Sequence, residues 1–258
     1  MSNYSGPSMG IPPVRQSSGS SSLPVIVIVL VVAVIGLVLC AGILAGLLLP
    51  AVQAAREAAR RMQCSNNCKQ IALALHNYQS TYRSMPPAYT VDAAGNRLHS
   101  WRTLLLPYLE QNAIYSRIDL SKPWNDPANA ILTQTVIPTF ACPSAHFDLG
   151  SGMTTYQVID DPSGAFPGST SVNFTQVKDG LSNTIFMIET DEKDAVHWAE
   201  PKDQSTAIYM SAQKGSHTGG RNAAMLDGSV QFISDSIDDQ TKKGLMTIQG
   251  GEVVGAGL

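Results

Sequence analysis

The sequence lacks the short motifs by which most catalytic sites are recognised. It contains no nucleophile elbow at a strand-to-helix turn, no metal-protease helix, no phosphate loop and no dinucleotide fingerprint. The five histidines are dispersed along the chain. These absences predict a protein that is not an enzyme and that binds no cofactor.

Charge of either sign is also scarce. Only 14% of the 258 residues are charged, and 17 basic against 20 acidic residues leave a net charge of −3. Nucleic-acid binding needs a basic patch or stripe, and the sequence has no such cluster. We therefore expect no nucleic-acid partner.

Cysteine is sparse, with four residues in the chain. A zinc site needs four ligands near one another, and no second cysteine or histidine pair stands in the sequence to join Cys64 and Cys68. We therefore predict no metal site of this kind. A disulfide from this pair to Cys142 would tie two distant segments together, although the residues alone leave open which of the two cysteines it would use.

Residues 23–49 form an apolar run without a single charged side chain. About 20 such residues span the hydrocarbon core of a bilayer as a helix, so this run predicts a single membrane span and membrane lipid as a partner. Gly42 and Gly46 form a GxxxG pair, a spacing that lets two helices approach closely. Residues 1–22, rich in Ser, Gly and Pro, are typical of disorder.

Residues 50–84 continue the helical pattern beyond Pro50. Strong helix formers fill the first turns, where Glu57 and Arg61 are spaced for an i,i+4 ion pair. An apolar stripe at helical spacing follows, and Pro86 and Pro87 end the pattern. The stripe predicts a stalk helix that buries one face, made of Cys64, Cys68, Ile71, Leu75, Tyr78 and Tyr82.

Residues 85–258 read as a globular α+β domain with its own core. Ser100 is placed to cap a helix over residues 101–115 that Pro107 divides. Short extended segments are expected at 136–141 and 156–159, a buried strand at 184–190, and a last helix near Ser236. Residues 223–226 and 229–233 predict a hairpin with a two-residue Asp227-Gly228 turn.

Several motifs of the chain occur together in one protein family. The segment 47–82 (LLLPAVQAAREAARRMQCSNNCKQIALALHNYQSTY) resembles a bacterial pilin-like family of unknown function, domain of unknown function 1559. The resemblance is also carried by Ser-Trp-Arg at 100–102, Cys-Pro-Ser at 142–144, Lys-Asp-Gly-Leu-Ser-Asn-Thr at 178–184, and a His-x(9)-Asp-Gly signature from His217 to Gly228.

The resemblance implies a pilin or pseudopilin fold, in which a long N-terminal helix packs on a small antiparallel sheet. It places cysteines at both ends of a Cys64–Cys142 disulfide, and it places the domain outside the cytoplasm, on an inner-membrane anchor. The positive-inside count, with Arg15 before the span and Arg56, Arg60 and Arg61 after it, favours the opposite orientation. We follow the family and the cysteines.

One departure separates the chain from pilins. Members of the family begin with a basic leader, a glycine and Phe-Thr-Leu-Ile-Glu at the entry to the apolar run, whereas residues 20–26 here read SSSLPVI. We therefore expect no prepilin peptidase cleavage, and we expect a protein that keeps its anchor.

His217, Asp227 and Gly228 are the residues of the family signature. His217 and Asp227 flank the first strand of the predicted hairpin and are candidates for a catalytic pair. Asp227 and Gly228 also suit the turn for backbone reasons, and a histidine beside two glycines can hold a loop by hydrogen bonds. We favour the structural interpretation.

Asp179, Glu189 and Asp191 stand around one predicted turn and strand, where their carboxylates could gather as calcium ligands. Calcium sites in the C-terminal loops of some pseudopilins give this hypothesis slight support, but the spacing matches no EF-hand loop.

The sequence thus predicts a membrane-anchored, non-catalytic protein of the cell envelope that works through its surfaces. Its partners would be membrane lipid and either copies of itself or other pilin-like subunits. The alternative is a membrane-anchored ligand-binding or sensor module.

Overall fold

The computed structural model describes residue 10 and residues 23–147, 150–211 and 215–251. The chain divides into two compact units, residues 1–54 and residues 55–258. Helix α1 (Leu23–Tyr82) contributes to both, and each unit is described separately.

The first unit contains the apolar part of α1. Residues 24–54 are all solvent-exposed, and among the described residues α1 is the one helix long and apolar enough to cross a membrane. A Cβ atom added to Gly42 or to Gly46 would meet nothing within 4 Å. The glycine pair therefore lies on an open helix surface.

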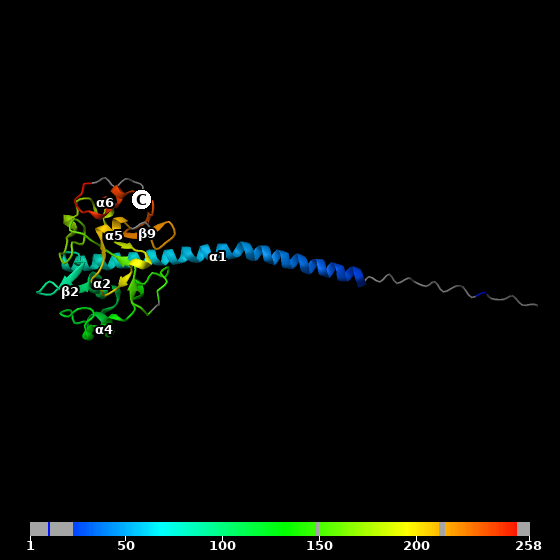
Figure 1. The fold of residues 1–258 in the computed structure, drawn as a ribbon, viewed down its shortest axis with the longest axis horizontal. Helices are drawn as coiled ribbons and strands as arrows, with labels where there is room; N and C mark the ends of the chain where they lie inside the picture. The colour runs from blue at the N-terminus through cyan, green and yellow to red at the C-terminus, as the bar shows by residue number, and fades with distance from the viewer. Residues whose placement is uncertain (1–9, 11–22, 148–149, 212–214, 252–258) are drawn as a thin grey trace, which may run out of the picture. The chain divides into compact units, whose positions relative to one another are not determined.

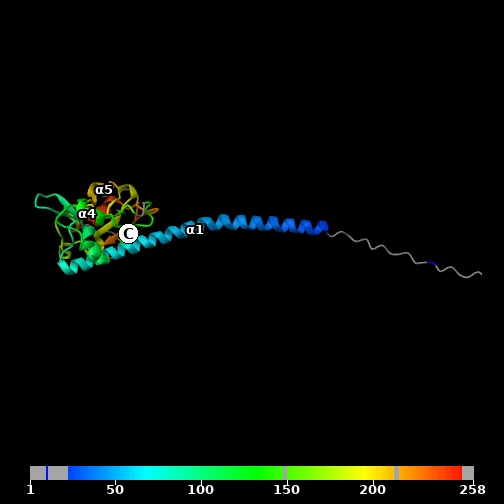
Figure 2. The same ribbon diagram turned by 90° about the horizontal axis from the view of Figure 1, so that it is seen from below.

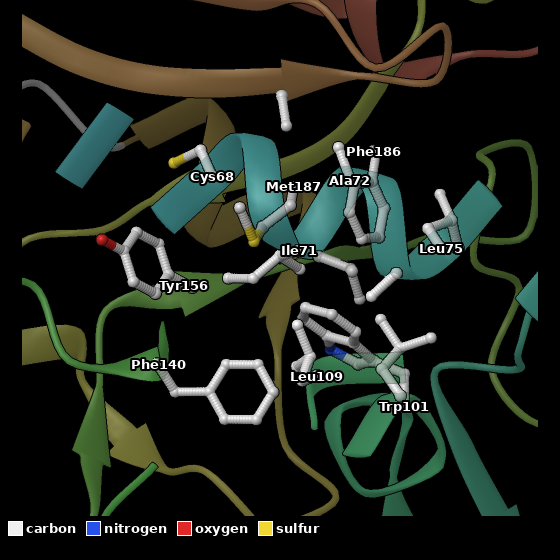
Figure 3. Packing of buried hydrophobic residues seen from close by; sticks show 14 of the residues in the cluster. Cys68, Ile71, Ala72, Leu75, Trp101, Leu109, Phe140, Tyr156, Phe186 and Met187 are labelled. Carbon is white, nitrogen blue, oxygen red and sulfur yellow. The ribbon is translucent and has the colours of Figure 1, made fainter. Parts of the chain in front are cut away.

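The second unit is organised around the C-terminal part of α1 (Figures 1 and 2). The predicted stripe is confirmed for Cys64, Cys68, Ile71 and Leu75, which are fully buried, whereas Tyr82 at the end of the helix is 58% exposed. Figure 3 shows this stripe against aromatic side chains from the rest of the domain, among them Trp101, Phe140, Tyr156 and Phe186.

A four-stranded antiparallel sheet covers this stripe. Its order is β10 (Val230–Ser234), β9 (Gly220–Met225), β6 (Ile185–Glu189) and β4 (Tyr156–Gln157). Every residue of β6 is buried; the apolar residues 185–188 predict this, whereas Glu189 is a charged residue buried at the end of the strand. Phe186 and Met187 pack in the cluster of α1, whereas Ile185 and Ile188 belong to a second cluster with residues of α5 (Thr206–Ser211) and α6 (Asp239–Met246).

Short elements complete the domain. Three further strand pairs are β1 (Tyr89–Val91) with β2 (Arg97–Ser100), β3 (Met153–Thr154) with β7 (Val196–His197), and β5 (Ile159–Asp160) with β8 (Gln204–Ser205). The other helical segments are α2 (Trp101–Leu105), η1 (Leu106–Leu109), α3 (Asn112–Tyr115), α4 (Pro127–Thr133), η2 (Pro138–Phe140), η3 (Phe174–Gln176), η4 (Leu181–Asn183) and η5 (Glu192–Asp194).

Arg102 fixes the loops beneath α2 from a fully buried position. Its guanidinium lies 2.6 Å from a carboxylate oxygen of Asp203. The same group donates hydrogen bonds to four backbone carbonyls, those of Tyr156, Trp198, Glu200 and Lys202. Burial raises the pKa of Asp203, and the neighbouring guanidinium opposes that rise.

Some local predictions are wrong in detail. The hairpin loop has three residues, 226–228, because Val230 pairs with Ala224 and Gly228, at φ +89°, closes a turn on the Met225 carbonyl. Segment 136–141 contains the helical turn η2 where an extended segment was expected, and the last helix begins at Asp239, capped by Asp238. Glu57 pairs with Arg60 one turn away and not with Arg61, which instead stacks on the ring of Phe232.

Candidate functional site

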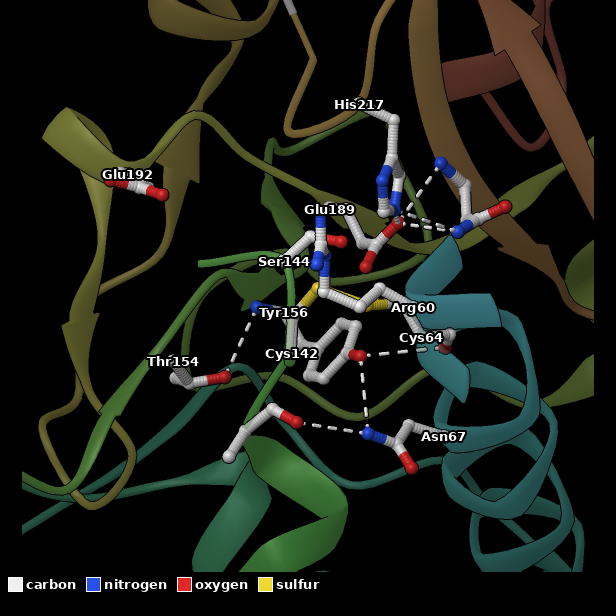
Figure 4. The surroundings of a disulfide bond; sticks show 12 residues. Arg60, Cys64, Asn67, Cys142, Ser144, Thr154, Tyr156, Glu189, Glu192 and His217 are labelled. Carbon is white, nitrogen blue, oxygen red and sulfur yellow. Dashed lines mark hydrogen bonds and ion pairs between the residues drawn. A yellow bond between two sulfur atoms is a disulfide. The ribbon is translucent and has the colours of Figure 1, made fainter. Parts of the chain in front are cut away.

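A buried cluster joins four segments that are separated in the sequence (Figure 4). Cys64 lies on α1, Cys142 follows η2, Glu189 ends β6, and His217 precedes β9. All four residues are at most 5% exposed, and their potential ligand atoms lie within 4.8 Å of one another.

The structure joins Cys64 to Cys142 in a disulfide. Their Cα atoms are 5.2 Å apart, although 78 residues separate them in the sequence. The bridge fastens the segment around Cys142 to α1. A crosslink that closes a loop of this length removes roughly 4–5 kcal/mol of conformational entropy from the unfolded chain in the chain-entropy description.

His217 lies between two carboxylates. Its Nε2 atom is 3.1 Å from Oε2 of Glu189, and its Nδ1 atom is 3.4 Å from Oε1 of Glu57. Burial disfavours the imidazolium, but the two glutamates outweigh burial and raise the pKa of His217. Two backbone hydrogen bonds of 3.2 Å with Gly220 hold the histidine at the entry to β9.

Glu189 places a carboxylate inside the protein. Its Oε2 atom accepts hydrogen bonds from the backbone and side-chain nitrogens of Asn222, at 3.2 and 2.6 Å, in addition to facing His217. Its Oε1 atom is buried and has no hydrogen-bond partner in the described part of the chain. A buried carboxylate is costly unless it is paired, so His217 and Asn222 stabilise its charge.

Glu57 extends the cluster along α1 toward the surface. Burial would raise its pKa, but hydrogen bonds from Arg60, His217 and Ser144 lower the pKa below its ordinary value. The Ser144 hydroxyl is 3.3 Å from this carboxylate. Glu57 therefore stays ionised beside His217.

Two further groups border the cluster and are held in neutral form. Burial raises the pKa of the Cys68 thiol, and the negative charge of Glu189 raises it further. Burial also raises the pKa of the Tyr156 hydroxyl, with smaller contributions in the same direction from the neighbouring Cys68 and Glu189. A thiol must ionise to act as a nucleophile. Cys68 is therefore a packing residue of the core.

The three calcium candidates do not form one site in the described chain. The Asp179 carboxylate accepts hydrogen bonds from the backbone of Gly250 and Gly251, at 2.7 and 2.9 Å. Asp191 caps η5 by accepting from the Lys193 nitrogen, and Glu189 is enclosed with His217. Each carboxylate thus has its own partners.

The signature residues have separate places. His217 precedes β9 and Asp227 follows it, so the length of the strand stands between them. Asp227 accepts a hydrogen bond from the Ser229 nitrogen at 2.8 Å, and Gly228 takes the left-handed backbone conformation that the turn requires. Both residues shape the turn.

Sequence reasoning missed Glu57 and Asn222 as neighbours of His217. Glu57 is 160 residues from His217, and no local pattern reports a contact of that range. Asn222 follows the histidine by five residues, within the region of the His-x(9)-Asp-Gly signature. That signature was the one available signal for it.

A cavity of about 390 Å³ is lined by Cys142 and by residues on both sides of it in the sequence. Its walls are mostly apolar and include the aromatic rings of Phe140, Phe147 and Trp198. The Trp198 indole donates a hydrogen bond to the Thr135 carbonyl, which fixes the ring in the wall. The cavity can therefore accept an apolar group.

Comparisons with known proteins identify a family. Residues 53–160 and 203–240, more than half of the chain, match the family described as "Protein of unknown function (DUF1559)". No curated protein and no solved structure matches the chain. The matched segments contain Cys64, Cys142 and His217. The chain belongs to the DUF1559 family of proteins of unknown function.

Proposed function

We propose that this protein is a membrane-anchored, non-catalytic structural protein of the cell envelope, shaped like a pseudopilin. The observation that carries the proposal is that the two parts of α1 have different surroundings. Residues 24–49 form an exposed, uncharged helix, whereas Cys64, Cys68, Ile71 and Leu75 of the same helix lie in the core of the domain. One helix thus serves as both anchor and core element.

The disulfide supports a location of the domain outside the cytoplasm. Disulfides persist in oxidising compartments and are rare in the reducing cytosol. The positive-inside count opposes this orientation, but it is a statistical preference that other features override. The inner membrane with the domain on its outer side is the location that we propose.

Assembly through the anchor follows from its open glycine pair. Gly42 and Gly46 stand one helical turn apart on an exposed surface, where a second helix could approach the backbone closely. Copies of the same chain or other pilin-like subunits are the proposed partners.

Protease protection in intact cells with a permeabilised outer membrane tests the topology. Protease added from outside should degrade the domain while α1 stays in the membrane fraction after alkaline extraction. A domain that survives until the inner membrane is broken would place it in the cytoplasm and refute the proposal.

The double variant Gly42→Leu/Gly46→Leu tests association through the anchor. It should form fewer crosslinked dimers in the native membrane than the control variant Gly36→Leu.

Ligand binding is the second candidate function, and the cavity beside Cys142 favours it. Its aromatic and aliphatic walls suit an apolar ligand of modest size. An environment-sensitive apolar dye should bind with one-to-one stoichiometry, and Ala145→Trp should block it by filling the cavity. Equal binding by this variant would remove the cavity from consideration.

A further inference from the structure

Four potential metal ligands meet at the disulfide. Two sulfurs, one imidazole and one carboxylate, from Cys64, Cys142, His217 and Glu189, lie within 4.8 Å of one another in the protein interior. Cysteine, histidine and glutamate are the usual ligands of zinc, and four of them make a closed tetrahedral site. While the disulfide is intact the sulfurs carry no charge and cannot bind a cation.

Two independent features of the cluster suit a metal ion. The Oε1 atom of Glu189 is buried without a hydrogen-bond partner among the described residues, although buried acceptors are normally satisfied. His217 directs Nε2 toward the carboxylate of Glu189 and Nδ1 toward the carboxylate of Glu57. A zinc-bound histidine commonly donates its second N–H to a carboxylate, which fixes the ring and strengthens the bond.

We propose that the reduced chain binds one zinc ion through Cys64, Cys142, His217 Nε2 and Glu189, with Glu57 orienting the histidine. Ligand atoms around one tetrahedral zinc lie roughly 3.3–3.8 Å apart. The two sulfurs separate when the disulfide is reduced, so small movements of buried side chains complete the site. Zinc and the disulfide are alternative ways of holding the same segment on α1.

Conversion of the disulfide form into the zinc-bound form requires a reductant. A dithiol reductant supplies two electrons and two protons, which break the S–S bond and give the thiols of Cys64 and Cys142, while the reductant becomes a disulfide. Zinc then binds the two thiolates and two protons leave to solvent. A disulfide oxidant reverses the sequence: it accepts two electrons from the two thiolates and two protons from solvent and becomes a dithiol, while the S–S bond forms and the zinc ion is released.

Cobalt titration of the full-length protein in detergent tests the site. After reduction by a phosphine under anaerobic conditions, one equivalent of Co²⁺ should produce the thiolate-to-cobalt charge-transfer absorption and the visible bands of a tetrahedral site. Zinc should abolish these bands and raise the melting temperature of the reduced protein. The oxidised protein should show neither effect. Absence of the charge-transfer absorption in the reduced protein would overturn the proposal.

Variants assign the ligands. The double variant Cys64→Ser/Cys142→Ser should lose the charge-transfer absorption and each single variant should weaken it, whereas Cys68→Ser and Cys40→Ser should keep it in full. Glu189→Gln should keep the absorption but weaken zinc binding at least about tenfold, as should His217→Ala. Loss of the bands in Cys68→Ser, or persistence of the charge-transfer absorption in the double variant, would show that the metal binds elsewhere.

A measurement without variants covers the case in which a substitution prevents folding. Zinc should protect Cys64 and Cys142 of the reduced wild-type protein from alkylation, as read by peptide mass mapping, and should leave the reactivity of Cys40 unchanged. Equal alkylation with and without zinc would refute the site. This outcome is independent of which side of the membrane the domain occupies.

Discussion

Asp203 and Glu189 are carboxylates buried in the domain, and their partners differ in kind. Asp203 faces Arg102, a permanent cation whose donors also hold four backbone carbonyls. Glu189 faces His217, whose charge depends on its protonation, and a sulfur pair whose state depends on redox conditions. Each carboxylate keeps one oxygen without a partner among the described residues. Whether such an oxygen can bind a metal therefore depends on the neighbouring groups: Asp203 faces a cation, whereas Glu189 faces an imidazole and two sulfurs that can themselves be metal ligands.

Removing the permanent cation should have the largest effect. Arg102→Met leaves Asp203 charged in the interior and frees four carbonyls, so we expect a loss of about 3–5 kcal/mol in the free energy of unfolding. Chemical denaturation followed by circular dichroism measures it. Lys122→Met, which breaks an exposed ion pair with Asp119, is the control and should unfold like the parent. Equal stability of both variants would show that the Arg102 network is dispensable.

Removing the disulfide should come next. The double variant Cys64→Ala/Cys142→Ala should lose about 2–5 kcal/mol of stability, because the unfolded chain regains the freedom of a long loop. Denaturation of parent and variant without reductant gives the difference. The parent should fall toward the variant when a reductant is added, and a parent that is insensitive to reductant would contradict the bridge.

His217→Ala should have an intermediate effect. The substitution removes the partner of a buried carboxylate, so we expect a loss of about 1–3 kcal/mol and a melting temperature several degrees lower. His146→Ala, whose pair with Glu192 is solvent-exposed, is the matched control. If His217→Ala melts like the parent yet loses a ligand, the residue serves binding and not stability.

His99 offers the smallest and most specific test, because it is a buried histidine that forms no ion pair with a carboxylate of the described residues. Burial lowers its pKa, and carbonyls of Lys122 and Asp119 only partly oppose the shift. The unfolded chain therefore binds a proton more readily than the folded one. Its contribution to stability is present above the ordinary histidine pKa and is lost as the pH falls from that value through the lowered pKa of the folded chain. Stability measured from pH 8 to pH 5 should fall less in His99→Gln than in the parent.

The sequence predicted those elements that local patterns determine. The stripe of Cys64 to Leu75 follows from helical periodicity, and the burial of residues 185–188 in β6 follows from an apolar run; the burial of Glu189 at the end of the strand does not. The hairpin was found from Asp227 and Gly228, but its loop was one residue too short because register depends on the partner strand. The pairing of Cys64 with Cys142 came from family resemblance alone.

The interior ionic contacts could not be predicted. Arg102 meets Asp203 across 101 residues, and Glu57 meets His217 across 160. Arginine, aspartate and glutamate side chains are mostly exposed in folded proteins, so residue type alone predicts a surface position for them. Only the three-dimensional path of the chain brings them inside.

The placement of α1 at the centre of the domain sets an order of events during synthesis. The helix leaves the ribosome first, yet the strands that cover Ile71 and Leu75 begin with β4 and β6, roughly a hundred residues later. The part of the apolar stripe that the sheet covers therefore stays exposed until β4 and β6 are made, and exposed apolar surface of this kind promotes aggregation. Cys142 arrives before β6 and β9, so a link to Cys64 can fasten the helix before its final neighbours exist. An early disulfide would then hold the segment around Cys142 on α1 and cover part of the apolar stripe before the remaining strands are synthesised.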